Sequence, residues 1–369
     1  MRKVGIMSMQ RIANYGSFLQ AYGLKHILEE LGCEVQFVDY HPGETLITAN
    51  GGKGIKRKIS KVIDAFNYDA PIKEKIKYIM YKKNYATNYY PYLKLGEMNY
   101  SPELDVLVIG SDEVFNCVQD NTNVGFSPEL FGEGNKAKKI VTYAASFGNT
   151  TMEKLEKYGV KNKVEAWINK ISSISVRDKN SGWIVSELTG KEPLYNLDPV
   201  LVYDFIGKCV DIIPIHVKGK YMILYGYSGR FSKEECKEIR IYADLRGLKV
   251  FCIGGVQNVC DKFIDCNPFQ VIAYFQCAEC VVTDTFHGTI FSVITHRQFV
   301  SKVRCEGYGN SEKLIDLLSR LKLESRIVND LGQLEDKILE RIDYREIDEI
   351  IEKERYRSYE YLRQEIENV

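Results

Sequence analysis

The sequence predicts an α/β protein built from two Rossmann-like lobes, and three observations support this fold class. The chain has 369 residues, which is long for one hydrophobic core and comfortable for two. Short β-branched runs alternate with apolar positions at helical spacing, which is typical of βαβ units. The alternation pauses from Tyr203 to Lys220 and then resumes. We therefore expect a first lobe over residues 1–204, a second lobe over 205–330 and a helical segment over 331–369.

The composition excludes several classes of protein. The chain has 50 basic and 50 acidic side chains, so it carries no overall charge that would attract nucleic acid. The apolar stretch at the start is too short for a secretory signal, and no later run reaches the roughly 18 apolar residues of a membrane-spanning helix. We therefore expect a cytoplasmic protein. Its 10 cysteines are scattered, which favours reduced thiols over a disulfide framework.

Only Cys277 and Cys280 have the spacing of metal ligands. They lie where a helix is expected to end and a strand to begin, and no second Cys or His pair stands at zinc-finger spacing. We interpret both as small core residues and expect no metal site.

The first lobe opens with a βαβ unit. A strand at Lys3–Met7 precedes apolar positions at helical spacing over 18–31, and a second strand follows at Val35–Asp39. The turn lacks the Gly-x-Gly-x-x-Gly pattern, so NAD or FAD is not expected there. Asn14 and Gly16 place a side-chain amide and an open backbone at the helix start, which suits a phosphate or a sugar hydroxyl. A helix cap and a tight turn explain them equally well.

Residues 45–100 break the α/β rhythm. From residue 53 to residue 83 there are ten Lys or Arg and three acidic residues, interleaved with apolar side chains. This pattern suits basic amphipathic helices that rest on an anionic membrane surface or a lipid-linked substrate. A solvated helical hairpin that covers the domain remains the alternative interpretation.

Polar residues follow the next two predicted strands. Asp105–Ile109 reads as a buried strand, and Ser111 and Asp112 come directly after it. Open α/β folds bind ligands at the carboxyl ends of parallel strands, so Asp112 is a candidate base or acceptor for a sugar hydroxyl. The strand at Lys139–Tyr143 leads to Ser146, which we expect at the same crevice.

The last strand of the first lobe introduces an arginine. Ile174–Val176 is followed by Arg177, whose guanidinium suits a two-point grip on a carboxylate or phosphate. A surface ion pair with Asp178 is the alternative. Asp198-Pro199 then ends the lobe, because proline cannot continue a central strand.

The second lobe repeats the alternation more compactly. Asn267-Pro268-Phe269-Gln270 has the N-cap, the proline and the glutamine of a well-capped helix start. A charged helix from Glu335 to the end is expected to brace the first lobe. The other elements expected are strands at Tyr221–Tyr225, Leu248–Cys252 and Gln298–Val303, and helices at Lys233–Leu245 and Asn310–Leu323.

The stretch from Val281 to Ile294 reads as strand, tight turn and helix. Free N–H groups and the helix dipole favour an anion at such a turn. His287 lies there as a candidate proton donor, and Gly288 would let a ligand approach the backbone. A histidine satisfied by core hydrogen bonds is the alternative.

Five short motifs stand in order along the chain: Asn14–Tyr22, Gly110–Phe115, Tyr143–Gly148, Ser175–Arg177 and Thr283–Thr289. They resemble the polysaccharide pyruvyl transferase family, and the resemblance covers the chain from residue 4 to about residue 330. It implies two facing lobes like those of GT-B glycosyltransferases, with phosphoenolpyruvate as the donor between them and no further cofactor. It also implies transfer of the pyruvyl (carboxyethylidene) group to two hydroxyls of one sugar as a cyclic ketal, with release of phosphate, in exopolysaccharide or cell-surface glycan synthesis.

The resemblance also implies roles for individual residues. His287 would bind the phosphate or protonate the methylene carbon, Asp112 would be the base, and Arg177 would hold the donor's carboxylate or phosphate. Some members carry Arg where this chain has Thr285, so we expect Lys302 or Arg304, after the next strand, to supply the missing charge; surface solvation is their alternative. The other residues assigned are Gly288 and Thr289 on the donor side, and Asn14, Tyr15, Gly16, Ser111 and Ser146 on the acceptor side.

The partners expected are phosphoenolpyruvate and a glycan or lipid-linked oligosaccharide, and not a nucleic acid. Residues 53–83 would allow peripheral contact with the inner face of the membrane. Two alternative functions remain open: a GT-B-type glycosyltransferase that uses a nucleotide sugar, and a non-catalytic binding protein of glycan assembly.

Overall fold

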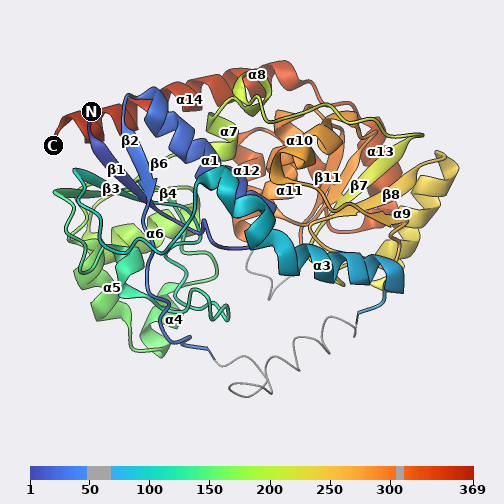
Figure 1. Cartoon of the computed structure of the whole chain (residues 1–369). Helices are drawn as coiled ribbons and strands as arrows, with labels where there is room; N and C mark the ends of the chain where they lie inside the picture. The colour runs from blue at the N-terminus through green and yellow to red at the C-terminus, as the bar shows by residue number, and fades with distance from the viewer. Residues whose placement is uncertain (48–67, 305–310) are drawn as a thin grey trace.

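A computed structural model describes residues 1–47, 68–304 and 311–369 of the chain. It contains two six-stranded sheets in which every pairing between the described strands is parallel, and helices pack around both (Figure 1). The first sheet has the order β2-β1-β3-β4-β5-β6 and the second β12-β11-β10-β7-β8-β9. This arrangement confirms two Rossmann-like lobes.

The strands of the first sheet are β1 (Lys3–Met7), β2 (Glu34–Phe37), β3 (Val106–Asp112), β4 (Lys139–Ala145), β5 (Ser175–Val176) and β6 (Leu194–Tyr195). Those of the second are β7 (Tyr221–Tyr225), β8 (Lys249–Ile253), β9 (Lys262–Phe263), β10 (Val281–Thr283), β11 (Phe299–Lys302) and β12 (Ile327–Val328). The longer strands lie within a few residues of their predicted positions. The sequence analysis did not predict the two-residue strands β6, β9 and β12, whereas it did predict β5, which is equally short, at Ile174–Val176.

Helices follow most strands, as the alternation predicted. In the first lobe they are α1 (Tyr15–Glu30), α4 (Met152–Lys157), α5 (Lys161–Ile168), α6 (Lys179–Thr189) and α7 (Pro199–Val202), and the short α8 (Phe205–Lys208) lies in the connection between the lobes. In the second they are α9 (Lys233–Leu245), α10 (Pro268–Cys277), α11 (Phe286–Ile294), α12 (Ser311–Arg320) and α13 (Leu334–Leu339). The predicted capping box of α10 is present, with both reciprocal bonds between Asn267 and Gln270.

The two lobes meet through an apolar interface. Phe18 of α1 packs edge-on against Phe269 of α10, with ring centroids 5.6 Å apart. Beside it the buried Tyr15 hydroxyl donates a hydrogen bond of 2.8 Å to the Cys266 carbonyl. The ring of Tyr15 therefore belongs to the core between the lobes, whereas the sequence assigned it to the acceptor site.

The C-terminal helix α14 (Tyr344–Glu367) crosses back to the first lobe (Figure 1). Its Tyr361 hydroxyl donates to the Thr142 carbonyl at 2.8 Å, and Arg355 Nε donates to the Val202 carbonyl at 2.6 Å. These bonds hold the end of the chain against β4 and α7. The predicted brace is confirmed.

Helix α3 (Ile72–Tyr89) covers part of the predicted basic insertion; residues 48–67 of that insertion lie outside the described residues. Its buried face carries tyrosines at every fourth position. Tyr85 donates to the Asn14 carbonyl of the first lobe at 3.0 Å, and Tyr89 donates to Asp265 of the second lobe at 3.4 Å. The helix thus crosses both lobes (Figure 1). The described part of the insertion forms a strap between the lobes.

The cysteine pair of the sequence divides into two environments. Cys280 is buried beside the hydroxyl of Tyr242, whereas Cys277 is exposed. Only Cys280 is the core residue that the spacing suggested. Within the three described ranges, no group of three or more His, Cys, Asp and Glu could hold a metal ion.

Candidate active site

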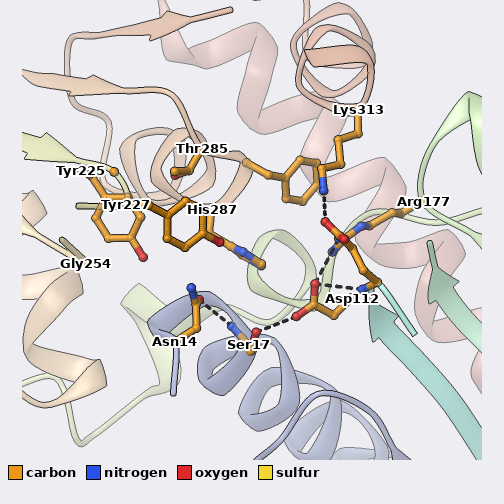
Figure 2. A pocket seen from close by; sticks show the side chains of 13 residues that line it. Asn14, Ser17, Asp112, Arg177, Tyr225, Tyr227, Gly254, Thr285, His287 and Lys313 are labelled. Atoms are coloured by element: carbon orange, nitrogen blue, oxygen red, sulfur yellow. Dashed lines mark hydrogen bonds and ion pairs between the residues drawn. The ribbon is translucent and has the colours of Figure 1, made fainter. Parts of the chain in front are cut away.

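A pocket opens between the lobes, where the carboxyl ends of strands from both sheets face each other (Figure 2). Parallel strands bring their carboxyl ends to one edge of a sheet, and two such edges meet here. The side chains and backbone that line the pocket come from Asn14, Ser17, Asp112, Glu113, Arg177, Tyr225, Gly226, Tyr227, Gly254, Thr285, Phe286, His287 and Lys313.

Asp112 ends β3 with a backbone φ of 78°, a left-handed conformation that turns the chain sharply at the pocket wall. Ser17 of α1 donates a hydrogen bond of 2.7 Å to its carboxylate. Burial alone would raise the pKa of Asp112, but Arg177, His287 and the Ser17 hydroxyl together hold that pKa below its ordinary value. Asp112 is therefore a carboxylate at neutral pH, as a base or a hydroxyl acceptor must be.

Arg177 lies buried between two carboxylates. Its NH1 is 2.8 Å from Asp198 and its NH2 is 3.2 Å from Asp112, while its guanidinium stacks over the ring of Phe286 at 4.5 Å. Burial lowers the pKa of Arg177, but the two carboxylates raise it above its ordinary value. The predicted surface pair with Asp178 does not form, because Asp178 caps α6 through Ser181 N. Arg177 is instead the centre of a buried charge network.

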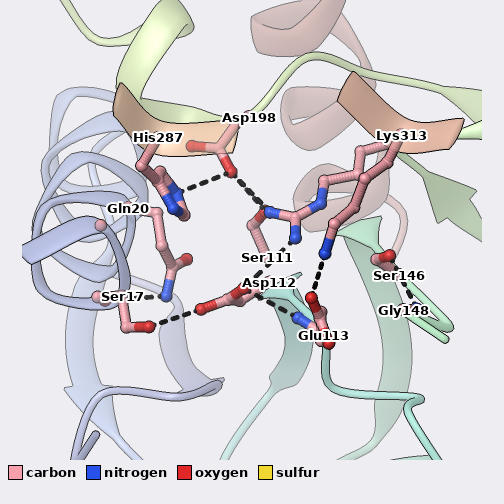
Figure 3. A network of polar contacts seen from close by, with 12 residues as sticks. Ser17, Gln20, Ser111, Asp112, Glu113, Ser146, Gly148, Asp198, His287 and Lys313 are labelled. Atoms are coloured by element: carbon pink, nitrogen blue, oxygen red, sulfur yellow. Dashed lines mark hydrogen bonds and ion pairs between the residues drawn. The ribbon is translucent and has the colours of Figure 1, made fainter. Parts of the chain in front are cut away.

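Asp198 is a site residue that sequence reasoning did not identify. Its carboxylate caps α7 through Val200 N at 3.0 Å, accepts from Ser111 Oγ at 3.3 Å and pairs with Arg177. It also lies 3.5 Å from His287 Nε2, an ion-pair distance when the imidazole is protonated (Figure 3). Although burial raises it, His287 and Arg177 bring the pKa of Asp198 below its ordinary value. The only signal in the sequence was an aspartate before a proline, which indicates a helix N-cap.

His287 lies in the first turn of α11 and lines the pocket. The ring rests on Gly16 of α1, where a Cβ would stand only 2.1 Å from His287 Nδ1. Gly16 therefore makes room for the histidine of the other lobe, whereas the sequence assigned it to the acceptor. The ring of His287 faces the pocket and has an ion-pair partner. These two features support a chemical role for His287 and not packing alone.

The other predicted residues of the His287 turn hold the turn together. Thr285 lines the pocket, but its Oγ1 already accepts from Gly288 N at 3.0 Å as the N-cap of α11. A Cβ on Gly288 would lie 2.2 Å from Thr283 Oγ1, so close packing of the chain, and not ligand access, requires glycine there. Thr289 is fully buried, with its hydroxyl 2.7 Å from Ser301 Oγ. Gly288 and Thr289 therefore lie behind the pocket wall.

The structure does not place Lys302 or Arg304 among the pocket-lining residues. Lys302 lies 3.5 Å from Glu235, and Arg304 donates to Asp284 at 2.8 Å and lies 3.4 Å from Glu235. Both positive charges are compensated within the second lobe. Among the described residues that line the pocket, the second lobe contributes one lysine, Lys313 of α12, which forms an ion pair with Glu113 of the first lobe.

The sequence analysis assigned Asp112 to the site but not the adjacent Glu113, and it contained no signal for Lys313. Although burial raises it, Lys313 holds the pKa of Glu113 below its ordinary value. Ser17, Gly226 and Tyr227 were also missed. Gly226 and Tyr227 directly follow the predicted strand Tyr221–Tyr225, so the rule that strand ends bind ligands could have found them, whereas Ser17 lies in the first turn of α1.

Among the predicted acceptor residues, only Asn14 lines the pocket with its side chain in view (Figure 2). Its Oδ1 accepts from Gly16 N at 2.7 Å and Ser17 N at 3.2 Å, so the helix-cap interpretation is correct. Ser111 donates to the Ala144 carbonyl at 3.1 Å, and Ser146 donates to Asp178 at 2.6 Å. Both serines are fully buried and support the wall from behind.

The family model for polysaccharide pyruvyl transferase matches residues 14–303, a span that includes both walls of the pocket except Lys313. The chain belongs to the polysaccharide pyruvyl transferase family. A search of curated proteins found no match.

Solved structures share the fold at low sequence identity. MnaA of S. aureus in complex with UDP superposes with a TM-score of 0.51 and 11% identity, over 98% of this chain and 95% of that one. The trehalose-6-phosphate synthase OtsA gives 0.50 and 10% identity, over 100% of this chain and 99% of that one. The two-lobed architecture of this chain is therefore GT-B-like.

Proposed function

We propose that this protein transfers the pyruvyl group of phosphoenolpyruvate to two hydroxyls of one sugar. The observation that carries the proposal is that His287, Arg177 and Asp112, from three distant segments of the family-matched region, line a single pocket. An enol phosphate needs an acid for its methylene carbon, positive charge for its anionic groups and a base for the attacking hydroxyl. In this proposal His287 is the acid, Arg177 supplies the positive charge and Asp112 is the base.

In the first step His287 donates a proton to the methylene carbon, which becomes the methyl group of the product. Positive charge develops at the neighbouring carbon, and the carboxylate of Asp112 faces this region with its negative charge retained. One sugar hydroxyl adds to that carbon and gives its proton to Asp112. The phosphate is still attached at this stage.

In the second step the carbon–oxygen bond to phosphate breaks and inorganic phosphate leaves. The second sugar hydroxyl attacks the same carbon and loses its proton, which closes the cyclic ketal. Of the two hydroxyl protons released, one replaces the proton that His287 gave to carbon and the other leaves on the phosphate as hydrogen phosphate, so the reaction balances without a redox cofactor. Asp198 pairs with both His287 and Arg177, so it holds the proton donor and the guanidinium group in fixed positions relative to each other.

A nucleotide-sugar glycosyltransferase is the second candidate, and one observation favours it. Arg177 already holds two carboxylates and Lys313 holds a third, so the pocket has little uncompensated positive charge for a small, highly charged donor. The fold is shared with MnaA, whose structure contains UDP. A non-catalytic binding role in glycan assembly is the third, and it predicts ligand binding without turnover.

Donor screening separates these functions. The chain is incubated with a panel of sugars and lipid-linked oligosaccharides, and with phosphoenolpyruvate or UDP-sugars. Release of inorganic phosphate together with a sugar product heavier by the pyruvyl ketal supports the proposal, and release of UDP supports the alternative. Binding of a glycan without release of either supports the third function.

We also propose peripheral contact with an anionic membrane through the outer face of α3. Ile72, Ile76 and Met80 are exposed there at four-residue intervals, and Lys73 and Lys83 flank them. Within the described ranges, none of the helices combines the length and apolarity that crossing a bilayer requires. Co-sedimentation with phosphatidylglycerol vesicles, and not with phosphatidylcholine vesicles, tests this contact; Ile76→Asp should abolish it. The proposed location is the cytoplasm, at the inner face of the membrane.

A further inference from the structure

The side chain of Lys313 is almost entirely buried where the two lobes meet. Only 6% of the side chain is exposed, although α12 belongs to the second lobe and its partner Glu113 to the first. Burying an ammonium group is costly unless a negative charge compensates it. The carboxylate of Glu113 therefore stabilises the positive charge of Lys313 in the pocket wall.

Arg177 and Lys313, the arginine and the lysine among the described residues that line the pocket, differ in how firmly they are held. Both terminal nitrogens of Arg177 bind buried carboxylates, at 2.8 Å to Asp198 and at 3.2 Å to Asp112. Those carboxylates are fixed in turn by Val200 N and by the Ser17 hydroxyl. Drawing Arg177 toward a ligand would leave buried charge uncompensated, so its position is set before any ligand binds.

Glu113, the partner of Lys313, is easier to displace than the two carboxylates that bind Arg177. The side chain of Glu113 is 29% exposed, and its second oxygen accepts from Asn116 Nδ2 at 2.8 Å, so the carboxylate can turn toward solvent without being isolated. The ammonium group has three donors in a rotating head. An incoming anion can therefore replace Glu113 at lower cost than it can replace either partner of Arg177.

Among the described residues, the second lobe contributes no other lysine or arginine side chain to the pocket. Thr285 is neutral and its hydroxyl caps α11, and Lys302 and Arg304 are compensated by acids outside the pocket. We propose that Lys313 is the donor-binding cation of the second lobe and that the donor's anionic group displaces Glu113 from it. This inference rests on the proposed function for the identity of the donor.

The ligand chemistry is an oxyanion, and the donor contains two: a phosphate and a carboxylate. Calorimetry on the full chain with phosphoenolpyruvate, inorganic phosphate and pyruvate separates them. Lys313→Met keeps the length of the side chain and removes the charge, and should weaken phosphoenolpyruvate binding about tenfold or more. A similar loss with phosphate alone assigns Lys313 to the phosphate end, and a loss with pyruvate alone assigns it to the carboxylate end.

Glu113→Gln removes the competitor for Lys313 and should tighten phosphoenolpyruvate binding by about threefold or more. The double variant Lys313→Met/Glu113→Gln should bind as weakly as Lys313→Met. Lys179→Met is the matched control, because the exposed Lys179 also makes a lobe-to-lobe pair with α12, through the buried Asp316, and lies outside the pocket. It should bind the donor as the parent does.

Equal losses in Lys313→Met and Glu113→Gln, with no further loss in the double variant, would show that the pair serves only to join the lobes and would overturn the inference. A parent protein that binds none of the three anions would also overturn it. If phosphate binding depends on Lys313 while no acceptor is pyruvylated, the inference stands and the proposed function fails.

Discussion

The two walls of the pocket are built differently. On the first-lobe wall, Asp112, Arg177 and Asp198 each contact at least two polar partners and are fully or almost fully buried. On the second-lobe wall, His287 and Lys313 each have one ion-pair partner among the described residues, and in both cases it lies on the first lobe. The first lobe is therefore a fixed electrostatic template, while the second lobe contributes groups that can exchange partners.

The sharpest test of this division is His287→Gln. It removes the proton donor while keeping a polar side chain of similar reach, so transfer should fall by about 10² to 10⁴-fold. Melting temperature should change little, since the ring contributes to the site more than to the core. His296→Gln is the control, because His296 pairs with Asp348 on the exposed surface. Transfer within about threefold of the parent would remove His287 from the mechanism.

Arg177→Met should show its largest effect on stability, because it leaves Asp112 and Asp198 buried without their cation. We expect a loss of about 3–5 kcal/mol in the free energy of unfolding, measured by urea denaturation. Arg177→Lys should recover part of the stability but not the two-point geometry. Adding Asp112→Asn to Arg177→Met should restore stability in part; a further loss instead would contradict the template model.

The same variant has a predicted pH dependence. The folded-state pKa values of Asp112 and Asp198 lie below their ordinary values, so their contribution to stability is present above about pH 4 and is lost as the pH falls through the folded-state values. The stability difference between parent and Arg177→Met should therefore be largest near neutral pH and shrink below about pH 4. A difference that is constant from pH 7 to pH 3 would mean that the carboxylates are not the cause.

Gly16→Ala tests the contact between the walls. A Cβ there would lie 2.1 Å from His287 Nδ1, so the ring must move, and transfer should fall by about 10- to 100-fold. Gly96→Ala is the control, because a Cβ at that position meets no atom within 4 Å. Thermal denaturation of both variants shows whether the loss is one of positioning or of folding.

The smallest effect is expected from Tyr15→Phe. It removes the hydrogen bond to the Cys266 carbonyl and should cost about 1 kcal/mol of stability, measured by urea denaturation. Transfer should be unchanged, because Tyr15 supports the joint between the lobes and not the pocket. A tenfold increase in KM for the sugar would instead show that Tyr15 contributes to the acceptor site.

The sequence by itself determined the two-lobed α/β fold, the strand ends that present Asp112 and Arg177, and the turn that presents His287. These features depend on local alternation, on caps such as Asn267 with Gln270, and on the rule that parallel strands share one functional edge. Each can be read from a window of a few residues, because the physical cause lies within that window.

Only the tertiary structure decided which side chains meet across the lobes. Lys313 and Glu113 are 200 positions apart, and Asp198 reaches both Arg177 and His287 from a turn that looked like a lobe ending. Lys302 and Arg304 were expected at the pocket, but acids of their own lobe compensate them. Charge is compensated by whatever lies within a few ångströms in space, and a single sequence contains no measure of that distance.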